Sequence, residues 1–189
     1  MRFVLLYWIT TVFFIGSAYA GAGKHRHHDV HVHGSGELNI VQEGRMLMID
    51  LNLPAMNVVG FEHKPKSQKQ KQALQSAKKS LNNGGELFVP TAAAACQLQS
   101  VDVDSALLEI EHHEEHHPHH QHEDEGESEH AEFSVIYEFS CKKVAQLRDV
   151  KVNLFNRFPS TEYLKAQVIT ESKQTGMKLS QKNSVITLK

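Results

Sequence analysis

Apolar and polar residues alternate along most of the chain, and this period of two constrains the fold more than any other feature. In DVHVHGSGELNIVQEGRMLMIDLNLP (residues 29–54) the apolar residues fall on every second position, Glu43-Gly44 supplies a turn, and Pro54 ends the run. This pattern predicts a β-hairpin. Further segments with strand-like patterns are residues 86–90, 96–110, 132–141, 147–159, 163–172 and 183–189.

One segment has a helical period instead. In KPKSQKQKQALQSAKKSLNNGG (residues 64–85), Leu74, Ala77 and Leu81 lie at helical spacing, and Asn82-Asn83-Gly84-Gly85 forms a stop. We expect one amphipathic helix that covers a sheet. Together with the strands, it predicts an α+β fold: an antiparallel, β-rich single domain with one sheet or two packed sheets.

The first twenty residues read as an export signal. Arg2 is followed by an apolar run from Phe3 to Ile15 and by the small-residue end Ala18-Tyr19-Ala20. A membrane anchor is the alternative, but the run is too short to span a bilayer comfortably. We therefore expect residues 1–20 to be a signal peptide, residues 21–189 to form the mature domain, and no membrane insertion after cleavage.

The mature chain has two cysteines, Cys96 and Cys141. A disulfide is the default expectation for such a pair in an exported protein. It would close the base of a hairpin formed by the flanking strands. A pair of thiolate metal ligands is the alternative, which the absence of CxxC spacing disfavours.

Charge is divided unevenly between an acidic segment and the rest of the chain. Residues 109–132 contain ten Asp and Glu and no Lys or Arg, whereas the rest of the mature chain has 19 basic and 12 acidic residues. Such an acidic segment repels nucleic acid and attracts cations. Nucleic-acid binding is therefore disfavoured.

Within this segment lies EHHEEHHPHHQHEDEGESEH, from Glu111 to His130, which we call the tract. It has no large apolar residue, so we expect a flexible insertion that captures metal with high capacity and modest affinity. Imidazole and carboxylate suit Zn²⁺, and also Ni²⁺ and Cu²⁺. A solvated spacer is the alternative. The candidate ligands are His112, His113, His116, His117, His119, His120, His122 and His130.

The tract also contains a match to the HExxH signature of zinc proteases, running from His113 to His117. That signature works only on a stable helix, which presents both histidines on one face. Here Pro118 follows at once, and such matches arise by chance in any run of His and Glu. We do not expect catalysis at this position.

A second group of histidines precedes the first strand. On a strand, His31 and His33 would point the same way, about 7 Å apart at the Cα atoms, so that both could bind one metal ion. Edge-strand histidines bonded to solvent or to carboxylates are the alternative. The candidate ligands of this ordered site are His27, Asp29, His31, His33, Glu62 and His63.

The stretch HHDVHVHGSGELNIVQEGRMLMIDLNLPAMNVVGFEH (residues 27–63) resembles the ZrgA-type zinc-uptake proteins of Gram-negative bacteria. Its most specific parts are His31 to Gly34, Asn52 to Ala55 and Gly60 to His63. The resemblance extends over the helical segment, the His-rich acidic insertion and FSVIYEFSC. It implies zinc binding in the periplasm and assistance to an ABC-type zinc importer, or to its periplasmic binding protein, when zinc is scarce.

Three hypotheses for function follow. The first is a non-enzymatic periplasmic protein that captures Zn²⁺ and assists high-affinity import. The second is a periplasmic buffer against excess Zn, Ni or Cu. The third is a zinc-dependent hydrolase, for which no nucleophile or base is identifiable outside the tract.

Overall fold

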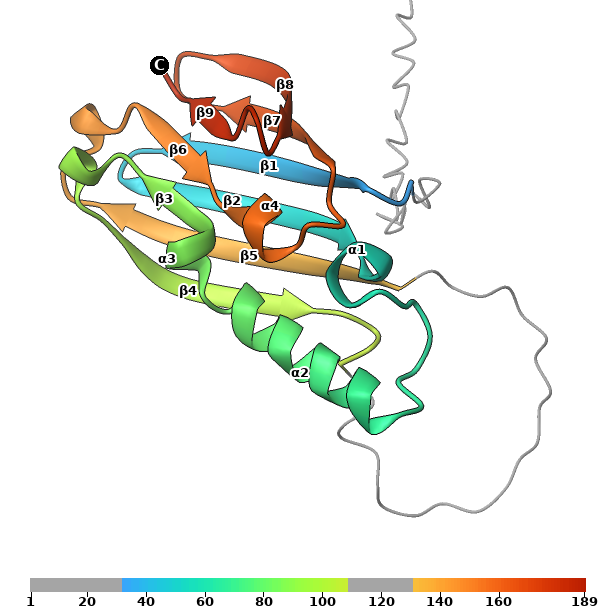
Figure 1. The fold of residues 1–189 in the computed structure, drawn as a ribbon. Coiled ribbons are helices and arrows are strands. Elements are labelled where there is room, and N and C mark those ends of the chain that lie inside the picture. The colour runs from blue at the N-terminus through green and yellow to red at the C-terminus, as the bar shows by residue number, and fades with distance from the viewer. Residues whose placement is uncertain (1–31, 109–130) are drawn as a thin grey trace, which may run out of the picture.

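The computed structural model describes residues 32–108 and 131–189, and these form two β-sheets with short helices between their strands (Figure 1). The prediction of a β-rich α+β fold is confirmed at this level. None of the helices in the two described ranges is long and apolar enough to cross a membrane. The elements are β1 (Ser35–Glu43), β2 (Met46–Pro54), α1 (Ala55–Val59), α2 (Gln68–Leu81), α3 (Gly84–Leu87), β3 (Phe88–Pro90), η1 (Ala92–Ala94), β4 (Cys96–Asp104), β5 (Glu132–Cys141), η3 (Val144–Gln146), β6 (Asp149–Val152), α4 (Leu154–Arg157), β7 (Tyr163–Ile169), β8 (Gln174–Ser180) and β9 (Val185–Thr187).

The larger sheet has six strands in the order β4-β5-β2-β1-β7-β8. The predicted hairpin is confirmed: β1 and β2 pair antiparallel, from Glu37 opposite Asn52 to Glu43 opposite Met46. One pair differs from the antiparallel prediction, because β1 and β7 run parallel. Alternation identifies a strand but does not identify its partner, so the sequence could not reveal this pairing.

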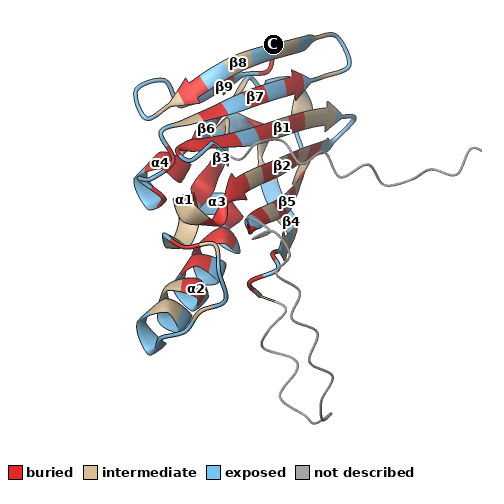
Figure 2. Ribbon diagram, turned by 90° about the vertical axis from the view of Figure 1, so that its right-hand side faces the viewer, coloured by how far each residue is buried: buried red, intermediate tan, exposed pale blue. Residues whose placement is uncertain are grey.

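The smaller sheet, in the order β3-β6-β9, covers one face of the larger one (Figure 1). The alternating apolar residues of β1, β2, β5 and β7 meet it in a shared core. Figure 2 shows the result as buried positions that alternate with less buried ones along β1, β2 and β7. The other face of the six-stranded sheet carries mostly polar side chains, such as Asn39, Asp50 and Asn52, which are hydrogen-bonded to one another.

Helix α2 occupies the segment with helical period. Ser67 caps its N-terminus in a capping box, in which the Ser67 hydroxyl accepts from the Gln70 N–H and the Gln70 side chain accepts from the Ser67 N–H. Leu74, Ala77 and Leu81 are buried. The helix packs chiefly on α1 and α3, and its N-terminal half projects away from the sheets (Figure 2).

Several predicted strands are shorter in the structure, such as β4, which ends at Asp104, and three further departures from the sequence-based assignments are larger. Strand β8 was missed, because Gly176 interrupts its apolar alternation. Residues Leu154–Arg157, within a segment that looked like a strand, form the short helix α4. The segment 86–90 is a strand only from Phe88, since α3 includes Leu87.

A disulfide joins Cys96 to Cys141, so the predicted pairing is confirmed over the thiolate alternative. These residues are register partners at one end of the antiparallel pair β4-β5, where a bulge lies between Leu98 and Ser100. At the other end Asp104 pairs with Ser134, and the tract connects the two strands beyond them. The disulfide therefore closes the hairpin at the end opposite the tract.

Candidate metal-binding site

Helix α1 organises the end of the molecule at which the ordered histidines were predicted. It begins directly after Pro54 and ends at Gly60, whose positive φ of 82° gives a left-handed cap. Asn57 on this helix is only 3% exposed. A buried amide needs hydrogen-bond partners, and those of Asn57 come from the chain before β1.

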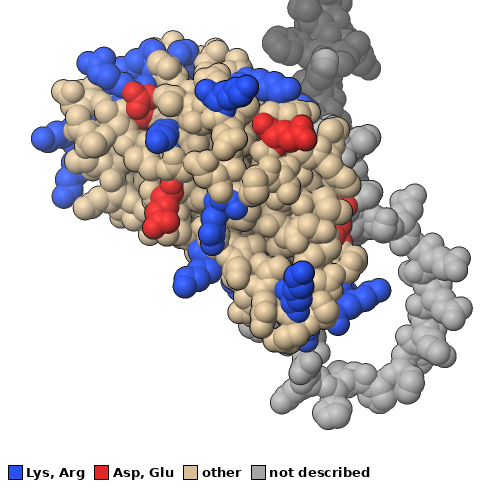
Figure 3. All heavy atoms as spheres, viewed as in Figure 1, with Lys and Arg blue, Asp and Glu red and all other residues tan. Residues whose placement is uncertain are grey.

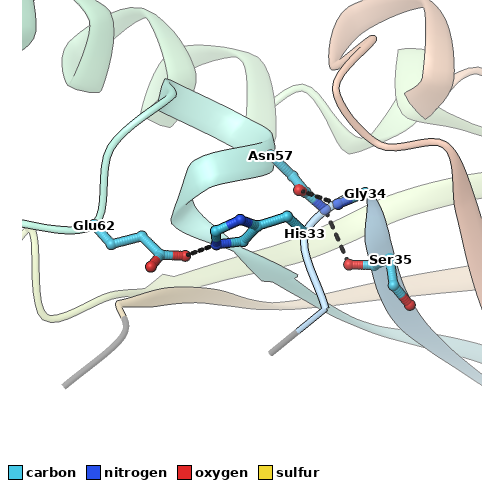
Figure 4. Close-up of polar contacts among 5 residues, drawn as sticks. All are labelled: His33, Gly34, Ser35, Asn57 and Glu62. Carbon is cyan, nitrogen blue, oxygen red and sulfur yellow. Dashed lines mark hydrogen bonds and ion pairs between the residues drawn. The ribbon is translucent and has the colours of Figure 1, made fainter. Parts of the chain in front are cut away.

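Asn57 holds the turn that contains His33. The Gly34 N–H donates to Asn57 Oδ1 at 2.8 Å, and Asn57 Nδ2 donates to the Ser35 carbonyl at 2.9 Å (Figure 4). Gly34 has a φ of +83°, and a Cβ there would lie 3.2 Å from the side chain of Glu162. The positive φ therefore favours glycine at this position, whereas the exposed side chain of Glu162 could move to admit a Cβ.

His33 consequently does not lie on a strand, and this part of the prediction is wrong. The Ser35 N–H donates to the Val32 carbonyl at 2.9 Å, so residues 32–35 form a turn, and β1 begins only at Ser35. The glycine that follows His33 produces this turn. His31 lies outside the described residues, so only the placement of His33 is corrected.

The turn directs His33 toward Glu62 on the segment after α1. His33 Nε2 lies 3.3 Å from Glu62 Oε1, and the two side chains are 54% and 13% exposed (Figure 4). The Glu62 oxygen is itself shielded from solvent. Two of the predicted ligands, which are 29 positions apart in the sequence, are thus in direct contact. We call His33, the Gly34–Ser35 turn, α1 and Glu62 the α1 corner.

The spacing of these two atoms suits a zinc ion. Two ligands at a tetrahedral angle, each about 2.05 Å from zinc, are about 3.3 Å from one another. The same spacing also suits an ion pair between a protonated histidine and a carboxylate, with no metal ion involved. A zinc site would need further ligands, because within residues 32–108 and 131–189 no three His, Cys, Asp or Glu side chains are grouped to hold a metal.

His63 has a different environment from its neighbour Glu62. Its ring centroid lies 5.5 Å from that of Phe61, and its Nδ1 lies 2.9 Å from the Lys64 carbonyl. A carbonyl can only accept, so Nδ1 donates this hydrogen bond, and in the neutral ring Nε2 is the nitrogen that could bind a metal. The exposed ring lines a shallow hollow with Val59, Ser67 and Gln70.

The remaining predicted ligands lie outside the described residues. They are His27, Asp29 and His31 before the first strand, and His112, His113, His116, His117, His119, His120, His122 and His130 in the tract. Both groups nevertheless join the described chain at the α1 corner. The N-terminal group ends next to Val32, and the residue after His130 is Ala131, whose carbonyl accepts from the Ala55 N–H at 2.8 Å.

Sequence reasoning did not identify Asn57 or the bond between Ala55 and Ala131. A single asparagine in LPAMNVVGF has no periodic pattern that would mark it as buried. The only available signals were Pro54 and Gly60, which bracket a segment too short for a predicted helix. Those two residues are consistent with one tight turn of helix, but they do not indicate what it contacts.

Comparison with known proteins bears on these observations. A family model described as "ZrgA family zinc uptake protein" matches residues 30–188. No curated protein sequence is similar enough to the chain to count as a match. The family match spans both sheets, the α1 corner and the tract. This chain therefore belongs to the ZrgA family of zinc uptake proteins and has a role in zinc uptake.

Proposed function

We propose that this protein is a non-enzymatic zinc-capturing protein of the periplasm, which supplies zinc to an ABC-type importer or to the importer's binding protein. The tract collects Zn²⁺ at high capacity and modest affinity. The ion then moves to the α1 corner, or directly to the partner.

The observation that supports this proposal best is the convergence at the α1 corner. His33 and Glu62 are in contact there, and α1 is bonded at Ala55 to Ala131, the residue that follows the tract, and at Asn57 to the Gly34–Ser35 turn. One short helix thus holds the described residues that directly follow each histidine-bearing segment. Transfer of a metal ion from many weak ligands to a few fixed ones needs such proximity, since ligand exchange requires the donors to meet.

Electrostatics supports the first step. The ten acids of residues 109–132 attract a divalent cation, and the neutral imidazoles among them can replace its water ligands. Histidine must be deprotonated to bind a metal, and its ordinary pKa is about 6.5. We expect zinc binding by the tract to weaken strongly between pH 7 and pH 5.5, whereas attraction by carboxylates alone would persist to about pH 5.

Calorimetric zinc titration of the mature protein at both pH values and at two salt concentrations tests this step. Binding that falls with pH and changes little with salt supports imidazole ligation. Binding that ignores pH but collapses at high salt would show diffuse attraction by acids, because salt screens charges and barely affects coordinate bonds.

The second step is tested in a protein that lacks residues 111–130, so that only the ordered site remains. His33→Ala and Glu62→Gln should each weaken zinc binding by tenfold or more, and Glu37→Gln on the open sheet face serves as the charge-matched control. Equal binding by all three variants would remove the α1 corner from the proposal. An equal loss on His63→Ala would extend the site to His63.

Expression of the protein under zinc starvation and under zinc excess separates uptake from buffering. An increase on starvation supports supply to an importer. An increase only under excess zinc, nickel or copper would instead support the buffer alternative.

A further inference from the structure

The exposed side of α2 and of the segment before it has an unusual charge. Residues 64–85 contain six lysines and no acid, and all six lysines are exposed. Figure 3 shows basic side chains over α2 with no acidic side chain among them. We call these residues the lysine face: Lys64, Lys66, Lys69, Lys71, Lys78 and Lys79.

Surface helices usually mix both signs, because acid–base pairs three or four residues apart stabilise them. Here no ion pair joins any residue of the lysine face to an acid among the residues that the structure describes. Lys69 and Lys71 also lie in the first turn of α2, where no acid is present. The positive end of the helix dipole disfavours cations at this place. The lysine face therefore has an uncompensated positive charge.

We propose that the lysine face is the docking surface for the tract of the same chain when the tract carries no metal. Charge complementarity supports this occupant, since residues 109–132 have ten acids and no base. Length supports it as well. The 22 residues between Leu108 and Ala131 could extend about 35 Å from two neighbouring strand ends, whereas α2 with 14 residues is about 21 Å long.

The position of the strand ends is also favourable. Strand β4, which leads to the tract, ends toward the same side of the molecule as the N-terminal half of α2 (Figure 1). That half projects from the sheets (Figure 2), and its lysines, Lys69 and Lys71, are exposed.

Docking on lysines and binding of zinc oppose one another, because both use the carboxylates of the tract. Each Zn²⁺ adds two positive charges, so about four ions would neutralise the eight acids of the tract and end the attraction. By linkage, the lysine face must weaken zinc binding by the same factor by which zinc weakens docking. This regulatory step rests on the proposed function, whereas docking of the metal-free tract does not.

Carbodiimide cross-linking of the metal-free mature protein tests the docking, because this reagent joins only lysines and carboxylates that touch. We expect bonds between Lys69, Lys71, Lys78 or Lys79 and the tract, at yields several times those of other exposed lysines. These yields should fall severalfold from 50 to 500 mM salt. Tract cross-links spread evenly over all exposed lysines, or none at all, would overturn the proposal and leave the face free for an external acidic partner.

The coupling is tested with two variants of equal charge. In the first, Lys69, Lys71, Lys78 and Lys79 are all changed to Gln; in the control, Lys142, Lys143, Lys151 and Lys182 are changed to Gln. All eight lysines are exposed, so both variants should fold. The first should bind zinc severalfold more tightly than the control at low salt. Equal affinities would refute the coupling.

The two proposals can fail separately. A tract that binds no zinc would refute the proposed capture, yet the cross-links of the metal-free protein to α2 would still establish docking. A tract that binds zinc equally in both variants and gives no preferred cross-links would refute docking alone.

Discussion

Asn57→Ala provides the sharpest test of the α1 corner, because Asn57 joins α1 to the His33 turn by two buried hydrogen bonds. Each such bond contributes about 1 kcal/mol net, and a buried partner left without one costs about 1–3 kcal/mol. The turn is partly open to water beside His33, so we expect a total loss of about 2–4 kcal/mol. For a chain of this length, that corresponds to a fall in melting temperature of roughly 4–15 °C.

Urea unfolding of the zinc-free, disulfide-intact protein measures this loss directly. Asn156→Ala is the matched control: Asn156 is exposed, and its contact with Gln181 is a surface hydrogen bond, so the change should stay within about 0.5 kcal/mol. A second readout is zinc binding by the protein without residues 111–130, which should weaken because His33 loses its fixed position. An Asn57→Ala variant as stable as the Asn156→Ala control would refute the role of Asn57.

Three other changes have expected outcomes. Deletion of residues 111–130 should lower the number of zinc ions bound and leave the melting temperature of the metal-free protein nearly unchanged. The reason is that Asp104 and Ser134, at the ends of the two strands, are already paired. A large fall in melting temperature would contradict this. The Cys96–Cys141 disulfide closes a loop over a sequence separation of 45. Its reduction should lower the free energy of unfolding by about 4 kcal/mol in the chain-entropy model. Equal urea midpoints before and after reduction would disprove this. Tyr137→Phe should raise the free energy of unfolding by about 1 kcal/mol, because the buried hydroxyl has no hydrogen-bond partner among the described residues. Burial also raises the pKa of Tyr137, so above about pH 10, where the unfolded tyrosine ionises, the wild type should lose more stability than the variant, by up to about 1.4 kcal/mol per pH unit. Parallel pH profiles would refute this.

The strands that sequence reasoning found are those with one buried face and one polar face. Leu47, Ile49, Leu51 and Leu53 in β2 alternate without interruption, and all are fully buried. The same alternation is present in β5, which has the predicted bounds. A strand of this kind can be predicted from the sequence because its residues are alternately apolar, on the buried face, and polar, on the face exposed to water.

Contacts between segments far apart in the sequence could not be predicted in this way. The parallel pairing of β1 with β7 joins segments more than a hundred residues apart, and no local pattern encodes it. For the site, the sequence supplied the ligand types at His33 and Glu62 but placed His33 on a strand. Gly34 turns the chain there through its positive φ, but the sequence analysis used it only as the end of the segment His31 to Gly34 that resembles the family.

The disulfide lies at the end of the β4-β5 hairpin opposite the tract, and this position affects how the length of the tract can evolve. A one-residue slip between β4 and β5 would turn every side chain of a strand to the wrong face, but the Cys96–Cys141 bond fixes their register from the far end. Insertions and deletions at the tip therefore leave the pairing intact. Natural selection can lengthen or shorten the tract by any number of residues, and so adjust how many metal ions one molecule carries, without redesigning the sheet.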